Sequence, residues 1–505
     1  MHIKRAKQEI KDSIEAYLKK DAYGEYVIPS IRQRPLLLMG PPGIGKTQIM
    51  EQVARECGIG LVSYTITHHT RQSAIGLPFI KEQKFGGRPY QITEYTMSEI
   101  IASVYEKMEK TGLKEGILFI DEINCVSETL APAMLQFLQC KTFGNQKVPE
   151  GWIIVAAGNP PEYNRSVREF DVVTLDRIKR IDVEENYEVW KAYAYEAGIH
   201  PAILSYLDLK REHFYRMETT PDGRAFATAR GWEDLSELLK VYESLGKKAD
   251  REVVHQYIQH WKIAKDFAVY LELYEKYQKD YGLEEIFKGQ WEKETLEKLA
   301  YASFDERLSV VGMLSGKLRE YFRRYVFLDT YVTRLYEALK QAKQDVERMD
   351  ELGQKEAAVY ERLRAAEQLT REEDHLWREV LDALEGWQKL VKEEHLSGEA
   401  AFGLVKEQFQ KEVDRRQTAA DEAGEALDRV FAFLEAAFGD SQEMVVFVTD
   451  LNTNASSLKY LKENDCDKYH RYNKRLLFDE QREEILSQMD AVEEGLSGVL
   501  KEDET

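Results

Sequence analysis

The sequence predicts an α/β domain with a parallel sheet, followed by a long, mostly helical C-terminal domain. Three observations predict this fold. A glycine-rich loop at 40–47 lies between an apolar run at 36–39 and a segment with helical spacing at 48–57. A second apolar run at 116–120 is followed by Asp-Glu. None of the twelve prolines lies after Pro221, and proline breaks helices.

The loop reads GPPGIGKT and fits the pattern of a phosphate-binding loop between a strand and a helix. Its glycines let backbone N–H groups turn toward an anion, and the helix N-terminus adds its positive end. Lys46 supplies a charge for the β- and γ-phosphates, and the Thr47 hydroxyl is a hard oxygen ligand for Mg²⁺. The predicted binding residues are Gly40, Pro41, Pro42, Gly43, Ile44, Gly45, Lys46, Thr47, Gln48 and Asp121.

Two further apolar runs end in polar residues that suit nucleotide hydrolysis. Asp121 can face the Mg²⁺ shell, so Thr47 and Asp121 are the predicted metal residues, and Glu122 can act as general base toward water. The run at 153–158 ends at Asn159, which can hydrogen-bond the γ-phosphate and the attacking water. Asn before Pro is also a common turn residue, so Asn159 alone is a weak signal.

Composition and charge argue against a nucleic-acid-binding C-terminal part, a zinc or disulfide-stabilised protein, and a membrane-spanning protein. About −18 of the net charge of −20 lies in residues 282–505, which makes that part a poor nucleic-acid surface. The four cysteines lack the spacing of a zinc site or a disulfide framework, which is typical of a reducing cytoplasm. No apolar run reaches the length of a membrane helix, and the charged N-terminus predicts an amphipathic helix at 4–20.

Local patterns predict several further elements. Residues 61–67 alternate like a strand, and glycine turns predict β-hairpins at 77–93 and 142–152. Thr96 with Glu99, and Thr370 with Glu373, have the spacing of helix-capping boxes. Residues 219–230 are expected to form a loop before a helix at 231–245.

These pieces, in this order, resemble the AAA+ ATPases and specifically their MoxR-like branch. The resemblance covers about residues 1–280 and is carried by GPPGIGKT, ILFIDEIN at 117–124, AAGNPPEYN at 156–164, LDRIKRIDV at 175–183 and FATARGWEDLSELL at 226–239. The first two motifs are strong signals of a phosphate-loop NTPase, and the last three are specific only in combination. The hairpin at 77–93 looks like the insert that this branch carries.

The resemblance implies a role for each matching residue. GPPGIGKT would be the Walker A loop, and Asp121 and Glu122 the Walker B pair. Asn159 would be sensor 1, Arg177 the arginine finger that reaches a neighbouring subunit's ATP, and Arg230 sensor 2.

Two departures from the family pattern leave alternatives open. Related sequences often have proline before the sensor-2 arginine, where this chain has Ala229. Arg180 lies close enough to Arg177 to be the finger instead. Whether Arg230 acts on its own subunit's nucleotide or on a neighbour's is also open.

The predicted domains are a nucleotide-binding domain at 1–197, a helical lid at 198–281 and a mostly helical domain at 282–505. Apolar residues from Val332 to Met349 follow the three-four spacing of a coiled-coil seam. An antiparallel helical arm at about 328–438 and a terminal subdomain at about 441–496 are expected, with a compact helical bundle as the alternative. The run EMVVFVTDL at 443–451 fits either a strand or a buried helix.

The leading functional hypothesis is a cytoplasmic ATPase that acts as a ring, expected to be a hexamer. The resemblance implies ATP hydrolysis between subunits, a chaperone-like action on client proteins, and a partner with a von Willebrand factor A domain. One alternative is a nucleic-acid-associated or GTP-using motor of the McrB type. Another is a scaffold with a slow nucleotide switch.

Overall fold

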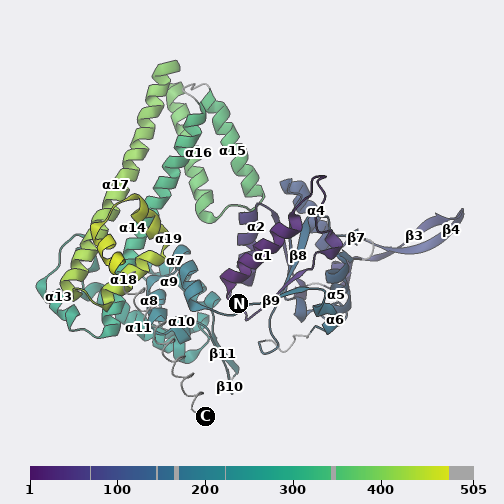
Figure 1. The fold of residues 1–505 in the computed structure, drawn as a ribbon, viewed down its shortest axis with the longest axis horizontal. Helices are drawn as coiled ribbons and strands as arrows, with labels where there is room; N and C mark the ends of the chain where they lie inside the picture. Colours follow the sequence, from purple (N-terminus) through teal and green to yellow (C-terminus); the bar gives the residue numbers. More distant parts are fainter. Residues whose placement is uncertain (69, 144–145, 164–169, 222, 343–347, 477–505) are drawn as a thin grey trace, which may run out of the picture. The chain divides into compact units, whose positions relative to one another are not determined.

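The computed structural model describes residues 1–68, 70–143, 146–163, 170–221, 223–342 and 348–476 (Figure 1). The chain folds into two compact units, each assembled from three segments. The first contains Met1–Trp190, Phe214–Asp234 and Glu347–Lys389, and the second contains Lys191–His213, Leu235–Val346 and Leu390–Thr505. The domain boundaries expected at residues 197 and 281 stay a prediction.

The first unit is built on a five-stranded sheet in the order β2-β5-β8-β1-β9. Every neighbouring pair is parallel. The strands are β1 (Leu36–Met39), β2 (Gly60–Thr65), β5 (Gly116–Asp121), β8 (Trp152–Gly158) and β9 (Lys179–Asp182). The carboxyl ends of parallel strands meet at one edge of a sheet, where ligands bind in open α/β folds. The predicted α/β fold with a parallel sheet is confirmed.

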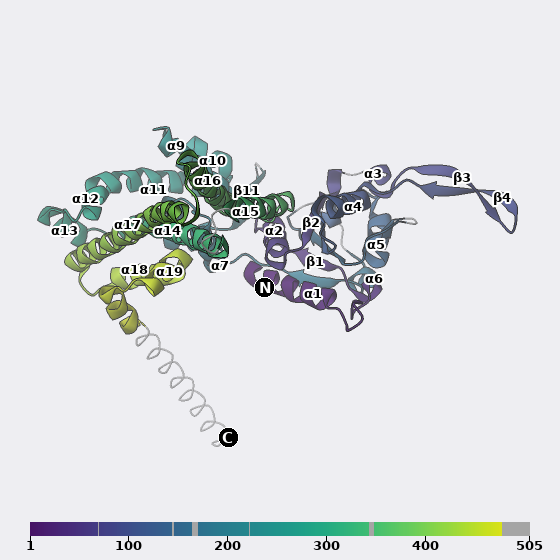
Figure 2. The same ribbon diagram turned by 90° about the horizontal axis from the view of Figure 1, so that it is seen from above.

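Helices cover both faces of this sheet, because successive side chains of a strand point to opposite faces. Leu36 and Leu38 pack with α1 (Ile3–Leu18) and α2 (Lys46–Cys57). The alternate residues of β1, Leu37 and Met39, pack with α4 (Glu99–Thr111) and α5 (Ala131–Cys140). Figure 2 shows α1 and α4 on opposite sides of the strands. The amphipathic helix predicted at 4–20 is therefore α1.

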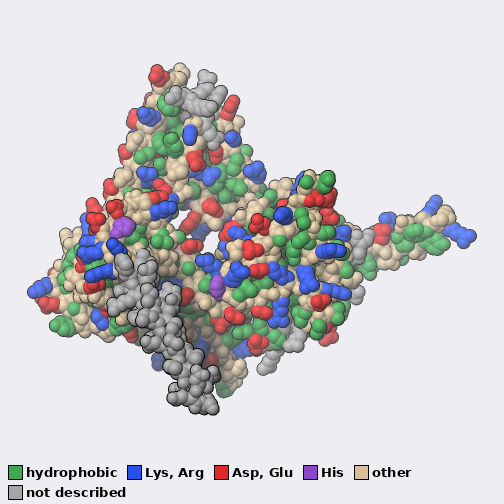
Figure 3. Space-filling view, in the orientation of Figure 1, with side chains coloured by type: hydrophobic (Ala, Val, Ile, Leu, Met, Phe, Trp, Pro, Cys, Tyr) green, Lys and Arg blue, Asp and Glu red, His purple; other side chains and the backbone are tan. Residues whose placement is uncertain are grey.

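Three two-stranded hairpins extend from this unit. They are β3 (Pro78–Phe85) with β4 (Arg88–Tyr95), β6 (Thr142–Phe143) with β7 (Gln146–Lys147), and β10 (Arg216–Thr220) with β11 (Gly223–Ala227). The first two confirm the predicted hairpins. The third corrects the loop expected at 219–230. The β3–β4 hairpin is exposed along its length and carries apolar and basic side chains (Figure 3).

The remaining elements of the first unit are short, apart from two helices late in the chain. They are η1 (Ser30–Arg32), η2 (Ile66–His68), α3 (Arg71–Ile75), η3 (Ile123–Cys125), α6 (Val172–Leu175), α15 (Arg348–Ala365) and most of α16 (Arg371–Glu393). Lys107 of α4 pairs with Glu367, with 3.0 Å between Nζ and the carboxylate. Part of the segment predicted as an arm thus packs within the first unit.

The second unit is almost entirely helical. Its elements are α8 (Pro201–Leu209), η4 (Arg211–His213), α10 (Arg251–Tyr257), α11 (Trp261–Asp280), α12 (Leu283–Phe287), α13 (Lys293–Ala300), α14 (Phe304–Ala342), α17 (Gly398–Phe438), α18 (Gln442–Thr453) and α19 (Ala455–Glu463). Helices α7 (Tyr187–Glu196), α9 (Ala229–Ser244) and α16 have residues in both units. Side chains of α12, α14 and α17–α19 form one apolar core.

Helices α14 and α17 run antiparallel. Arg324 pairs with Glu422 at 2.6 Å, whereas further along α14 Tyr336 packs on Phe409, with ring centroids 6.3 Å apart. Within the predicted seam, Val332 is buried. The seam's continuation into 343–347 lies outside the described residues, so its coiled-coil pairing there stays a prediction.

The ambiguous run at 443–451 is helical and lies in α18. Met444 and Phe447 are buried, whereas Val445 and Val446 are exposed, which is the pattern of one helical face. The capping box at Thr370 is confirmed because Glu373 and Thr370 exchange side-chain and backbone hydrogen bonds. The box expected at Thr96 is wrong, since α4 begins at Glu99 after Ser98.

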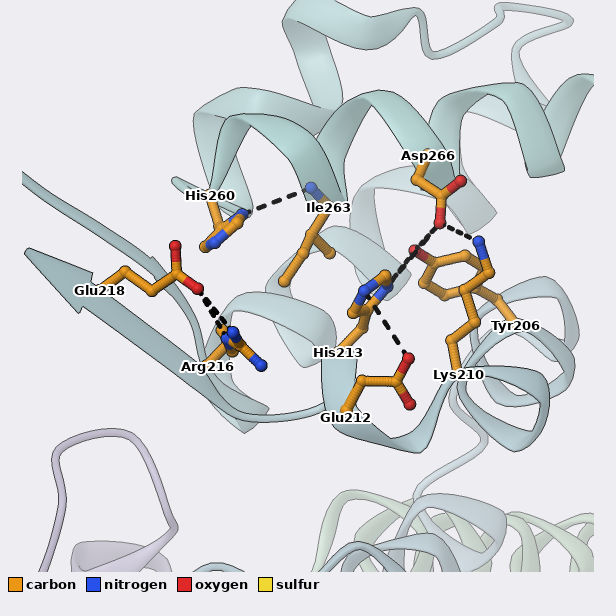
Figure 4. A network of polar contacts seen from close by, with 9 residues as sticks. All are labelled: Tyr206, Lys210, Glu212, His213, Arg216, Glu218, His260, Ile263 and Asp266. Atoms are coloured by element: carbon orange, nitrogen blue, oxygen red, sulfur yellow. Dashed lines mark hydrogen bonds and ion pairs between the residues drawn. The ribbon is translucent and has the colours of Figure 1, made fainter. Parts of the chain in front are cut away.

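Within the second unit, a polar network joins α8, η4 and α11 (Figure 4). Asp266 accepts hydrogen bonds from the Tyr206 hydroxyl, at 2.9 Å, and from Lys210, and the same hydroxyl lies 2.7 Å from Nδ1 of His213. Burial would raise the pKa of Asp266, but its bonds to Lys210 and Tyr206 hold that pKa below its usual value. We regard the network as a structural link between these three elements.

Candidate nucleotide-binding site

The glycine-rich loop connects β1 to α2, as the spacing of the sequence predicts. Gly45 precedes the first residue of α2 and has a φ of 91°, in the left-handed region that favours glycine. Lys46 and Thr47 are the first two residues of the helix. They therefore lie where the free N–H groups and the positive end of the helix dipole favour an anion.

Lys46 is buried, with 8 % of its surface exposed, and its ammonium group has three oxygen partners. Nζ donates to the carbonyls of Gly40 at 2.7 Å and Pro41 at 2.8 Å, and to Oδ1 of Asn159 at 2.9 Å. Burial is the main reason that the pKa of Lys46 is lowered to about 8, and the positive charge of Arg230 lowers it further. The negative charges of Asp121 and Glu122 act in the opposite direction and raise this pKa. A bound polyphosphate would favour the charged form and return this pKa upward.

This lowered pKa gives a pH-dependent prediction. We expect ATP affinity to be constant up to about pH 8 and then to fall by up to about tenfold per pH unit, because the free protein loses the Lys46 proton that the complex retains. Titrating a fluorescent ATP analogue from about pH 7 to about pH 9.5 measures this. Lys46→Arg is the control, since arginine stays charged over this range. Wild-type affinity that stays level to the highest pH contradicts the prediction.

Asp121 is the last residue of β5 and faces the phosphate loop. Its Oδ2 accepts a hydrogen bond of 2.9 Å from the Thr47 hydroxyl, and its Oδ1 accepts one from the Glu122 backbone N–H. Glu122 has a φ of 56°, an uncommon conformation for a residue other than glycine. Its carboxylate accepts a hydrogen bond of 2.8 Å from the hydroxyl of Thr67, which lies in η2, directly after the neighbouring β2.

Asn159 lies between the phosphate loop, which follows β1, and Asp121, at the end of β5, because β8 is inserted between these two strands. Its side chain contacts Lys46, and its backbone carbonyl accepts a hydrogen bond of 2.8 Å from the buried side chain of Asn124. A Cβ on Gly158 would lie 2.6 Å from Oδ1 of Asn124, so only glycine fits there. The sheet order thus brings together side chains from three separate strand ends.

The two finger candidates are both exposed and differ in their partners. Arg177 donates to the side-chain oxygen of Gln139 on α5, which is a neutral group. Arg180 forms an ion pair with Asp182, with 2.8 Å between nitrogen and oxygen. Among the described residues, neither arginine is a hydrogen-bond partner of Lys46, Thr47 or Asp121.

Arg230 lies at the start of α9, which contacts the phosphate loop directly. Its backbone N–H donates to the Gly43 carbonyl at 3.2 Å, and the hydroxyl of Tyr215 donates to the Pro42 carbonyl at 3.0 Å. Burial raises the pKa of Tyr215 well above its usual value, so this hydroxyl stays protonated. Residues after the last strand of the sheet, Tyr215 and Arg230, therefore hold the phosphate loop at the carbonyls of Pro42 and Gly43.

Sequence reasoning missed four residues that contact the predicted ones. Thr67 contacts Glu122, Asn124 contacts Asn159, Tyr215 contacts Pro42, and Glu233 contacts Gln48. Thr67, Asn124 and Glu233 stand within or beside quoted patterns, but nothing in their spacing indicates their partners. In the described part of the chain, no group of three His, Cys, Asp or Glu side chains is arranged to hold a metal ion.

Residues 36–177 match the family model for ATPases associated with various cellular activities (AAA). This part of the chain is similar to an AAA domain. This family consists of ATPases, and the matched residues include the phosphate loop, Asp121, Asn159 and Arg177.

Comparison with solved structures gives a match of low similarity. A crystal structure of a candidate ATPase from Cytophaga hutchinsonii is 17 % identical, with a TM-score of 0.21. The match covers 36 % of this chain and 52 % of that protein, so the chain spans about half its length. A TM-score this low gives no support for a shared overall structure. No curated protein matches the sequence. Within the described residues, the helices are all too short or too polar to cross a bilayer.

Proposed function

We propose that this protein is a MoxR-like AAA+ ATPase that hydrolyses ATP between the subunits of a ring to remodel or mature other proteins. One observation carries the proposal. At the start of α2, Lys46 bonds to Asn159 after β8, and Thr47 bonds to Asp121 at the end of β5, which in turn accepts from the Glu122 N–H.

The donor set fits Mg²⁺ together with a triphosphate. The Thr47 hydroxyl and the Asp121 carboxylate present two hard oxygens 2.9 Å apart. Adjacent oxygens of an octahedral Mg²⁺ site, each about 2.1 Å from the ion, are separated by about 3 Å. When bound, Mg²⁺ would neutralise charge on the β- and γ-phosphates.

In the proposed reaction, Glu122 takes a proton from water as the water oxygen bonds to the γ-phosphorus. The bond from that phosphorus to the bridging oxygen breaks, and ADP and phosphate leave. Lys46 holds the phosphate oxygens, and Asn159 orients Lys46 and the water. Arg230, at the start of α9, contacts the γ-phosphate. Release of this phosphate after hydrolysis removes the contact, so α9 and the hairpins shift.

The ring assignment depends on Arg177. Its exposed guanidinium donates to Gln139 rather than to its own subunit's loop, and its charge acts on the exposed Asp171, whereas Arg180 forms a direct ion pair with Asp182. This supports Arg177 as the finger that completes a neighbour's site. A hexamer, a von Willebrand factor A domain partner, client proteins and a cytoplasmic location follow from the family resemblance alone.

The test is specific ATPase activity over a wide range of protein concentration, with Glu122→Gln as the blank. We expect activity per subunit to rise steeply with concentration, because the site forms only between subunits. Activity per subunit that does not change with protein concentration would contradict the hypothesis that Arg177 acts on a neighbouring subunit's ATP. No turnover at any concentration would favour a slow nucleotide switch. GTP preference, or stimulation by DNA, would favour the McrB-type alternative.

A further inference from the structure

The start of α9 contacts the phosphate loop and α2 at two points that bracket Lys46 and Thr47. The first is a backbone bond, from the Arg230 N–H to the Gly43 carbonyl, at 3.2 Å. The second joins two side chains: Nε2 of Gln48 donates to Oε2 of Glu233, at 3.1 Å. The second contact fixes the helix beyond the loop, one turn after Arg230.

Glu233 also has a second donor. Its Oε1 lies 3.3 Å from Nε1 of Trp190, whose side chain is buried. Burial raises the pKa of Glu233, while the bonds from Gln48 and Trp190 oppose that rise. A partly buried carboxylate costs free energy that an apolar side chain would not, so packing alone does not account for an acid at this position.

Arg230 and Glu233 are three residues apart on one helix and therefore lie on the same side of it. The backbone of Arg230 bonds to the Gly43 carbonyl, and a Cβ placed on Gly43 would lie 3.6 Å from the Cβ of Arg230. The side chain of Arg230 therefore begins beside the phosphate loop. Because successive turns of a helix move together, an anchor at Glu233 sets the direction of the turn that carries Arg230.

We propose that Glu233 is a positioning residue that holds Arg230 toward the γ-phosphate by anchoring α9 to α2 through Gln48. Glu233 itself does not touch the nucleotide. This inference rests on the proposed function, in which Arg230 registers the γ-phosphate. It predicts that Glu233 affects ATP and ADP differently, because only ATP carries the group that Arg230 contacts.

The experiment compares dissociation constants for ATP and ADP in the full-length protein, with Glu122→Gln present throughout to prevent hydrolysis. We expect Glu233→Ala to weaken ATP binding roughly tenfold and ADP binding less than about twofold, the size of one charge-assisted contact. Glu233→Gln should stay within about twofold for both, since its oxygen can accept from Trp190 while its NH₂ group donates to Gln48, whose exposed amide can turn over to accept. Asp234→Ala, which removes the neighbouring exposed carboxylate, is the matched control and should change neither.

A double-substitution cycle identifies the route of the effect. In an Arg230→Ala background, Glu233→Ala should cause no further loss of the preference for ATP, because the group that it positions is gone. If the two losses multiply instead, Glu233 does not act through Arg230. Equal weakening of ATP and ADP by Glu233→Ala would also overturn the proposal and make the residue merely structural.

Two controls separate this inference from its premises. If Glu233→Ala does not fold, as measured by circular dichroism, Gln48→Ala removes the same hydrogen bond from an exposed side chain. Because Gln48 is also a predicted binding residue, its loss of ATP preference supports the anchor only if that loss disappears in the Arg230→Ala background, and a loss that persists there overturns the proposal. If the parent protein binds neither nucleotide, the proposed function fails together with the inference. If it binds both and Glu233→Ala keeps the preference for ATP, only the inference fails.

Discussion

Replacing Glu122 by glutamine should lower the rate of ATP hydrolysis about 10²–10⁴-fold and leave ATP binding intact. Glu122 follows the strand that carries Asp121, and its carboxylate is held by the Thr67 hydroxyl at 2.8 Å. Glutamine keeps that acceptor and the shape of the side chain but is a far weaker base. Lys46 and Thr47, which hold the phosphates, keep their partners. Single-turnover hydrolysis and binding of a fluorescent ATP analogue measure the two quantities separately.

The matched control is Glu109→Gln, which makes the same change on the exposed surface of α4 and should hydrolyse ATP at the wild-type rate. Hydrolysis by Glu122→Gln within about twofold of wild type would mean that another group accepts the proton. Loss of ATP binding together with turnover would point to damage of the loop rather than to a lost base.

Replacing Arg177 by alanine should lower turnover about 10³–10⁵-fold, the range of an arginine finger. Arg180→Ala is the natural comparison, because both arginines are exposed and lie three residues apart. Arg180 is already in a direct ion pair with Asp182, whereas the hydrogen bond described for Arg177 goes to the neutral amide of Gln139. We therefore expect Arg180→Ala to reduce turnover by less than about tenfold.

Mixing variants shows whether the finger acts between subunits. Arg177→Ala keeps an intact Lys46 site, and Lys46→Ala keeps an intact Arg177. If the finger acts in trans, mixing these two inactive proteins should restore part of the activity, because some interfaces combine an intact loop with an intact arginine. Mixtures as inactive as their components would indicate that Arg177 acts within its own subunit, or only stabilises the fold. The opposite ranking of the two arginine variants would make Arg180 the finger.

Some of the site could be read from the sequence because its signals are local. The glycine loop, the lysine and the threonine act within one turn of one helix, so their spacing alone indicates their chemistry. The strands at 116–121 and 152–158 are continuous apolar runs, as expected for strands buried on both faces. The acidic end of the first run and the asparagine after the second could be identified for the same reason.

Other segments were ambiguous because two structures share one local pattern. The run at 443–451 is rich in β-branched residues, which favour strands. Packing in the second unit decided for a helix, since Met444, Phe447 and Val448 bury one helical face in the apolar core. A loop was expected at 219–230, and the pairing of β10 with β11 made most of that segment part of a hairpin.

The sequence by itself determined the α/β fold with its phosphate loop and the chemical types of the residues at its site, because these follow from spacings of a few residues. Only the tertiary structure decided which of these residues meet. The insertion of β8 between β1 and β5 brings Asn159 to Lys46, 113 positions apart, and the course of α9 brings Glu233 to Gln48, 185 positions apart. Contacts over such separations depend on strand order and helix packing, which no local pattern encodes.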